Sequence, residues 1–121
     1  MQLPKDYASF VTNYFDQQLK KKYFKTKDGK VESLLKSFIS RQDVEEYLNK
    51  KLGTELPEEL LPIAVDPAGN KICIGINGNV YGKIFYWGED EEYEEHEPSY
   101  DCIRLVADSF TEFMNGLTET R

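Results

Sequence analysis

The chain has few of the residues on which metal, redox or nucleophilic chemistry usually depends. Its 121 residues include one histidine, one tryptophan and two cysteines. A histidine-based metal centre or a nucleophile–histidine pair therefore has a single candidate imidazole, that of His96. Two cysteines also fall short of the disulfide framework of small secreted domains. Cys73 and Cys102 each lie in an apolar, strand-like segment, which predicts buried, reduced thiols.

The sequence also lacks a long apolar run and a secretory signal. No stretch approaches the ~20 consecutive apolar residues of a membrane helix, and the first six residues lack the charged-then-apolar pattern of a signal peptide. These absences predict a cytoplasmic protein with no membrane partner. Aromatic residues are plentiful by contrast, with eight tyrosines and seven phenylalanines. They bury enough area for one domain of this length to fold without disulfides or metals.

Basic residues are too few to balance the acidic ones, and the excess is local. The chain has 22 acids and 15 bases, a net charge of −7, and residues 89–97 alone contain seven acids. Outside that block the charges cancel, although residues 1–30 carry seven lysines and three acids. An acidic excess repels phosphates and therefore argues against a nucleic-acid ligand. It favours a basic protein as the partner.

Three helices are predicted from apolar periodicity and capping residues. The first runs from Pro4 to about Phe15, the second from the N-cap Ser40 to Gly53, and the last begins at the N-cap Ser109. Glu112, three residues after Ser109, predicts a capping box. The positions expected to face the core are Tyr7, Phe10, Val11 and Tyr14 in the first helix, Val44, Tyr47, Leu48 and Leu52 in the second, and Phe110, Phe113, Met114 and Leu117 in the last.

Strand-like runs and turn dipeptides predict a mainly antiparallel sheet. Asp28-Gly29 separates the runs 20–27 and 30–39, and Asn77-Gly78, the favoured type I′ pair, separates 71–76 from 79–87. Further strands are expected at 60–66 and 102–106. The runs 71–76 and 79–87 are apolar on both faces, which indicates central strands. The order of elements predicts one α+β domain, with a core cluster of Ile72, Ile74, Ile84, Phe85, Phe110 and Phe113.

The candidate motifs for cofactor binding and catalysis lack residues or spacings that such sites need. The glycine-rich run 75–83 has three residues, not four, between Gly78 and Gly82, and no Ser or Thr follows Lys83, so it does not predict a phosphate-binding loop. His96 lies among Glu94, Glu95 and Glu97, but no second His or Cys stands at ligand spacing. The sequence therefore predicts no metal, no cofactor and no catalytic site.

The junction between an aromatic strand and the acidic block is the best candidate for a partner-binding site. Aromatic side chains serve as anchors in protein interfaces, and rim carboxylates steer a basic partner. The alternative interpretation places Trp87 in the core and gives the acids a solubilising role only. The candidate partner-binding residues are Tyr86, Trp87, Glu89, Asp90, Glu91, Glu92, Glu94 and Glu95.

Four segments, taken in order, resemble the SMI1/KNR4 (SUKH) family. They are Leu-Pro-Lys-Asp-Tyr at 3–7 with Phe10, Pro-Ile-Ala-Val-Asp-Pro-Ala-Gly-Asn at 62–70, Ile-Phe-Tyr-Trp at 84–87 followed by acids, and Ser-Phe-Thr-Glu-Phe-Met at 109–114. The resemblance implies one SUKH-like domain over residues 1–121. Two features of the family's pattern are missing: a helix before the Leu-Pro pair, and an Asn-Gly-Gly where this chain has Asn13-Tyr14-Phe15.

The same resemblance implies a function in non-covalent binding. It suggests an intracellular protein that has no enzymatic activity and that, in bacteria, is often an immunity protein neutralising a cognate toxin, in some cases a nuclease. The alternative that it leaves open is a regulatory adaptor that binds an endogenous cellular protein.

Overall fold

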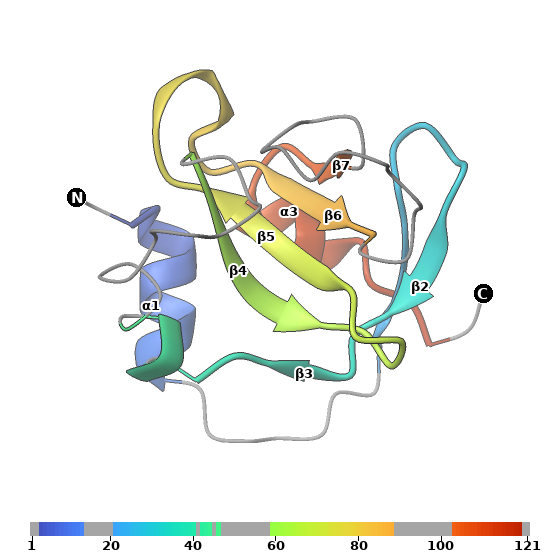
Figure 1. The fold of residues 1–121 in the computed structure, drawn as a ribbon, viewed down its shortest axis with the longest axis horizontal. Helices are drawn as coiled ribbons and strands as arrows, with labels where there is room; N and C mark the ends of the chain where they lie inside the picture. The colour runs from blue at the N-terminus through green and yellow to red at the C-terminus, as the bar shows by residue number, and fades with distance from the viewer. Residues whose placement is uncertain are drawn as a thin grey trace, which may run out of the picture.

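The computed structural model describes residues 3–13, 21–40, 42–44, 46, 59–88 and 103–119, with the side chains of 11–13 excepted (Figure 1). A helical turn covers 42–44 and 46. The other elements, in chain order, are helix α1 (Lys5–Asn13), strands β1 (Tyr23–Lys25), β2 (Glu32–Leu34), β3 (Ser37–Phe38), β4 (Leu60–Val65) and β5 (Lys71–Gly75), the 3-10 helix η1 (Gly78–Val80), strands β6 (Ile84–Trp87) and β7 (Ile103–Ala107), and helix α3 (Phe110–Asn115).

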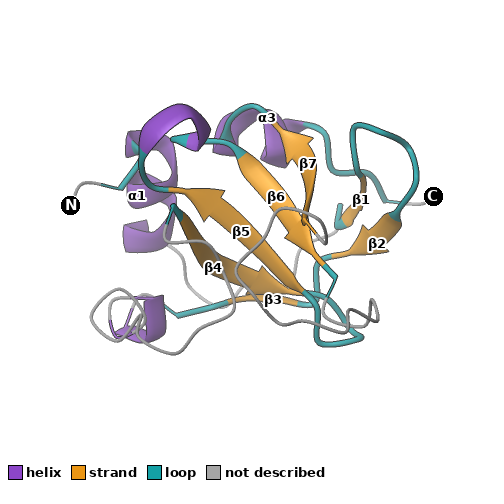
Figure 2. Ribbon diagram, turned by 45° about the horizontal axis from the view of Figure 1, so that its top comes forward, coloured by secondary structure: helices purple, strands orange, loops and turns teal. Residues whose placement is uncertain are grey.

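Five of the strands form one antiparallel sheet in the order β3-β4-β5-β6-β7, and β1 and β2 form a separate antiparallel pair. The prediction that the runs 71–76 and 79–87 supply central strands is confirmed by the positions of β5 and β6. The helices and the antiparallel sheets together confirm the α+β class. Figure 2 shows α1 and α3 close together beside the sheet.

The central strands bury side chains on both faces of the sheet. Ile72, Ile74, Ile84 and Tyr86 pack in the larger cluster with residues of α1, α3 and the β1–β2 hairpin. Phe85 packs on the other face, in a smaller cluster with Leu60, Cys73, Trp87 and Ile103. The prediction that Phe85 shares one cluster with Ile84 is therefore wrong, because consecutive residues of a strand face opposite sides. The other five residues predicted for that cluster are buried in it.

The loop between β5 and β6 differs from the predicted type I′ turn. That turn needs a positive φ at both central residues, whereas Asn77 has a φ of −159° and only Gly78, at +60°, is positive. The Asn77 side chain instead accepts a hydrogen bond from the Gly78 N–H and caps η1. Strand β6 consequently begins at Ile84, not at residue 79, and Val80 packs against the smaller cluster and not beside Ile84.

A glycine permits this loop to fold back on the sheet. The Gly75 N–H donates to the Lys83 carbonyl at 2.8 Å, and the Gly82 N–H donates to the Gly75 carbonyl at 2.9 Å. A Cβ on residue 75 would lie 1.8 Å from the Val80 carbonyl oxygen. No other residue can therefore occupy position 75 without moving the loop.

The first predicted hairpin forms, but its second run is divided between two sheets. Gly29 has a φ of +73°, and the Thr26 N–H donates to the Val31 carbonyl. Residues 32–34 then pair with β1, whereas 37–38 pair with β4 as the edge strand β3. The prediction of one continuous strand over 30–39 is therefore wrong. The chain changes partner after Leu35, where the Lys36 N–H donates to the Val65 carbonyl.

The predicted N-caps Ser40 and Ser109 are confirmed, whereas α1 begins at Lys5, one residue after the predicted Pro4. The Ser109 hydroxyl accepts the Glu112 N–H at 3.0 Å, but the Glu112 carboxylate accepts from the Asp108 N–H and not from Ser109, so only half of the capping box forms. Phe110, Phe113 and Leu117 are buried and Met114 packs against the core. The Ser40 hydroxyl accepts the Asp43 N–H, and Val44 is buried.

Several predictions for the other two helices lie outside the described residues. These concern the side chain of Val11, together with Tyr14, Phe15, Tyr47, Leu48, Leu52 and Gly53.

Candidate functional site

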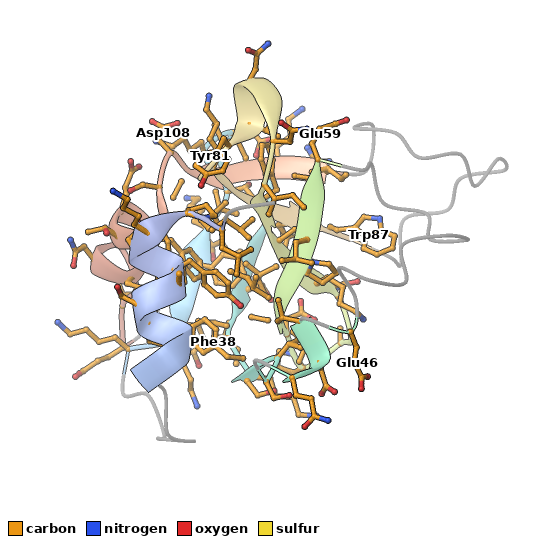
Figure 3. The ribbon with its side chains drawn as sticks, turned by 90° about the vertical axis from the view of Figure 1, so that its left-hand side faces the viewer. Phe38, Glu46, Glu59, Tyr81, Trp87 and Asp108 are labelled. Atoms are coloured by element: carbon orange, nitrogen blue, oxygen red, sulfur yellow. The ribbon has the colours of Figure 1, made fainter. Side chains whose placement is uncertain are left out.

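The two aromatic residues of the predicted binding site lie in β6 and are largely buried. Tyr86 is 6% exposed, faces the larger cluster, and has its ring centroid 5.9 Å from that of Phe24. Trp87 is 9% exposed, packs in the smaller cluster and points away from α1 (Figure 3). Little of either ring is therefore offered to a partner, and their role as anchors stays a prediction. The six acids of the predicted site, Glu89, Asp90, Glu91, Glu92, Glu94 and Glu95, lie outside the described residues, as do His96 and Cys102.

A buried polar network ends at the Tyr86 hydroxyl. This hydroxyl donates to Asp66 Oδ2 at 2.7 Å and accepts from Asn70 Nδ2 at 2.7 Å. Asp66 Oδ2 also accepts from the Ser33 hydroxyl at 2.8 Å, so the network joins the β1–β2 hairpin to β4 and β6. Asp66 Oδ1 accepts the backbone N–H groups of Ala68 and Asn70 at 3.0 and 2.8 Å. One carboxylate thus organises the turn between β4 and β5 and fixes the side chain of Tyr86.

Burial and hydrogen bonding act in opposite directions on Asp66. Burial disfavours the carboxylate, but hydrogen bonds from Tyr86, Ser33 and Asn70 outweigh it and hold the pKa of Asp66 below its ordinary value. Burial, followed by the hydrogen bond to the Asp66 carboxylate, raises the pKa of Tyr86 above its ordinary value. At neutral pH the network therefore contains an ionised Asp66 and a neutral Tyr86. Every donor around the carboxylate is used, which is the arrangement of a structural site and not of a general acid.

Comparison with known proteins agrees with this architecture. The family model described as "SMI1 / KNR4 family (SUKH-1)" matches residues 1–116. The chain belongs to the SMI1/KNR4 family. A protein of Bacillus subtilis (strain 168), described as "SPbeta prophage-derived uncharacterized protein YokK", is 30% identical over 140 residues, an alignment that covers 98% of this chain and 68% of that protein. No solved structure matches the chain.

The network gives a physical reason for one of the motifs that carry the SUKH resemblance. In the segment 62–70, Asp66 accepts the turn's N–H groups, Gly69 adopts a φ of +89°, and Asn70 links Asp66 to Tyr86. Sequence reasoning used this segment for recognition only and did not identify Asp66 and Asn70 as a buried pair. The available signal was the spacing: an aspartate and an asparagine four residues apart, between two apolar strands, are typical of a side-chain-stabilised turn.

Ion pairs attach the β1–β2 hairpin of this SUKH domain to β7 and α3. Lys27 Nζ lies 2.8 Å from the Glu112 carboxylate and 3.5 Å from that of Asp108, and its pKa is raised chiefly by the hydrogen bond to Glu112. Hydrogen bonds from the Thr26 hydroxyl and the Lys30 N–H, with the nearby Arg104 guanidinium, lower the pKa of Asp28 to about 2. Backbone hydrogen bonds from the Lys27 N–H to the Leu105 carbonyl, and between Tyr23 and Thr118, join the hairpin to β7 and to the residues after α3 as well.

The described residues offer little for other chemistry. Among them, no group of three or more His, Cys, Asp or Glu side chains is placed to hold a metal ion. The Cys73 side chain is buried in the smaller cluster. Within the same part of the chain, no helix is long and apolar enough to cross a membrane.

Proposed function

We propose that this SUKH-1 protein is a non-enzymatic, cytoplasmic immunity protein that neutralises a cognate toxin by direct binding. The observation that carries the proposal is that the entire net charge of −7 lies in residues 89–97, immediately after β6. The family includes immunity proteins, and one relative is described as prophage-derived. The partner is a basic protein, and neither nucleic acid nor a membrane is the ligand.

The charge of this segment suits the active cleft of a nuclease. Such a cleft is basic because it binds phosphates, and consecutive carboxylates can occupy it as phosphate mimics. The contact residues that we propose are Glu89, Asp90, Glu91, Glu92, Glu94 and Glu95, with Tyr86 and Trp87 at the adjoining strand end.

The rigid end of β6 supports this proposal. Trp87 is paired with Lys71 of β5 and with Ile103 of β7, and the preceding Tyr86 is held by Asp66. The acidic residues therefore start two positions after a firmly held residue. An attachment point that is already ordered reduces the conformational entropy lost when the segment binds.

The first test is neutralisation of toxicity. The open reading frames that flank the gene in its genome are expressed in a bacterial host with and without this protein, and growth is followed. We expect one of them to be toxic alone and harmless in the presence of this protein. If no neighbouring product is toxic, and pull-down from the host captures an endogenous protein that purified components confirm, the regulatory-adaptor alternative replaces this proposal.

The second test measures association with the purified, inactivated toxin by stopped-flow at low and high salt. Replacing Glu91, Glu92, Glu94 and Glu95 by glutamine should slow association several-fold and flatten its salt dependence, because exposed charges act over the ~8–10 Å screening length. A control with the same change in net charge replaces four exposed acids elsewhere, Glu32, Asp43, Glu46 and Glu119, by their amides. Equal rates and equal salt slopes for the two variants would show that the acidic block is not the contact.

A further inference from the structure

Charge is segregated within the described part of the fold as well. Residues 21–36, which form the β1–β2 hairpin and its flanks, contain six lysines and two acids, a net charge of +4. The remaining described residues contain four bases and eight acids, a net charge of −4. The hairpin lies at the side of the molecule away from α1 in both ribbon views (Figures 1 and 2). One side of the domain is therefore basic in a chain whose total charge is strongly negative.

Two of the six lysines of the basic hairpin, Lys25 and Lys27, form ion pairs, and the other four do not within the described residues. Its two acids are used in ion pairs, Asp28 with Arg104 at 2.9 Å and Glu32 with Lys25 at 3.4 Å. Lys27 is paired with Glu112 and Asp108. In the part of the chain that the structure describes, no carboxylate lies within ion-pair distance of the four other lysines of the segment, which are Lys21, Lys22, Lys30 and Lys36.

The register of the hairpin defines a basic outer face with an apolar centre. Phe24 and its partner Ser33 face the core, because Phe24 packs on Phe113 and Ser33 binds Asp66. The neighbouring pair, Tyr23 and Leu34, therefore faces outward, and both side chains are half-buried. By the same alternation Lys21 and Lys36, both exposed, extend this outer face beyond that pair, and Lys25 lies two residues along β1. Lys30, also exposed, lies in the connection between β1 and β2.

We propose that the outer face of the β1–β2 hairpin is a second binding surface, which takes an acidic protein segment containing apolar residues. The exposed Lys21, Lys30 and Lys36 supply charge complementarity, and Tyr23 and Leu34 supply the apolar contact at the centre. Lysines act here as point charges on flexible stems, so they accept carboxylates in varied geometries. A long phosphate backbone is disfavoured, because it would extend past the hairpin toward a chain of net charge −7.

The test uses a defined probe, a fluorescein-labelled peptide of alternating glutamate and phenylalanine, with fluorescence anisotropy as the readout. The test variant is Lys21→Gln/Lys30→Gln/Lys36→Gln, and the control is Lys5→Gln/Lys71→Gln/Lys83→Gln, which has the same net charge. We expect the Kd to rise about tenfold in the test variant and to change less than about twofold in the control, from the usual contribution of exposed charge pairs. Amide shifts in the NMR spectrum should map to β1 and β2.

Three results would overturn the proposal: no binding of the peptide, an equal loss in both variants, or tighter binding of an oligothymidylate of the same charge than of the peptide. A peptide with glutamine in place of glutamate tests whether the carboxylates are required, and binding that survives this change would also count against it. Emission of the buried Trp87 shows that both variants are folded. The outcome is separate from that of the toxin test, since the probe is acidic and the proposed toxin contact is made by acids.

Discussion

Removing the Asp66 carboxylate should destabilise the domain by about 3–5 kcal/mol. Asp66 accepts five hydrogen bonds, and Asp66→Ala would leave the Tyr86 hydroxyl and the Asn70 N–H without this acceptor inside the core. Each buried donor left unsatisfied costs about 1–3 kcal/mol. Ser33 is half-buried, so its hydroxyl can donate to water instead, and the loss of its hydrogen bond to Asp66 adds little to the cost. Tyr86→Phe removes the hydrogen bond to the Asp66 carboxylate and the one from Asn70 Nδ2, which keeps its 3.3 Å bond to Asp66, and should cost about 2–3 kcal/mol.

The double variant decides whether these residues act as one network. When the Tyr86 hydroxyl is absent, Asp66→Ala no longer leaves a buried donor at residue 86 without an acceptor. The cost of Asp66→Ala/Tyr86→Phe should therefore be smaller than the sum of the two single changes by about 1–2 kcal/mol. Urea denaturation measures all three variants, with the emission of the chain's single tryptophan, which is buried beside Tyr86, as the signal. Additive costs, or a cost below about 1 kcal/mol for Asp66→Ala, would refute the network as described.

The network also predicts how stability changes with pH. The folded-state pKa of Asp66 lies below its unfolded value of about 3.9, so its contribution is present above that pH and is lost as the pH falls through the folded pKa. The folded-state pKa of Tyr86 lies above its unfolded value of about 10, so its contribution is present below that pH and is lost as the pH rises further. Tyr86→Phe should reduce the alkaline loss of stability, and the part that remains belongs to Tyr7, whose pKa burial also raises.

Three further predictions concern the core, the β5–β6 loop and metals. Phe113→Ala should cost about 3–5 kcal/mol in chemical denaturation, because its ring is buried in the larger cluster against Phe24 of β1; a cost below about 1 kcal/mol would contradict the packing. Gly75→Ala should cost about 3 kcal/mol or more, since its Cβ would collide with the Val80 carbonyl, whereas Gly69→Ala, with open space but a φ of +89°, should cost about 1 kcal/mol. Calorimetric titration with zinc and calcium should detect no saturable site tighter than millimolar, and a one-to-one micromolar site lost on His96→Ala would disprove this.

Local patterns in the sequence predicted the elements that depend on few distant contacts. The two-sided apolarity of the runs 71–76 and 79–87 placed β5 and β6 correctly at the centre of the sheet, and Ser109 marked the start of α3. The strand-like run 30–39 was predicted as the second arm of a hairpin because it follows the turn dipeptide Asp28-Gly29. Its division follows from tertiary pairing, since Lys36 finds its hydrogen-bond partner in β4 and not in β1. Periodicity within a segment contains no information about such a change of partner.

The candidate site shows the same limit. Sequence reasoning identified Tyr86 and Trp87 from their place before the acidic block, but not what surrounds them. Tyr86 proves to be one end of a buried network whose other members lie 16 and 20 residues away in the sequence, at Asn70 and Asp66. Such a contact can be deduced only after β4, β5 and β6 have been aligned, because the register determines which side chains face one another.

The two proposed surfaces have opposite charge, and this makes a joint prediction about association rates. Replacing Lys21, Lys30 and Lys36 by glutamine should weaken binding of the acidic peptide. The same replacement changes the net charge of the chain from −7 to −10. Electrostatic steering depends on the electric field of the whole protein, so the same variant should associate somewhat faster with a basic toxin. The increase in rate should be larger at low salt. The control at Lys5, Lys71 and Lys83 should speed that association to a similar extent, because it changes the net charge equally. Slower association of the hairpin variant alone would mean that the toxin itself contacts the hairpin, and that one partner spans both surfaces.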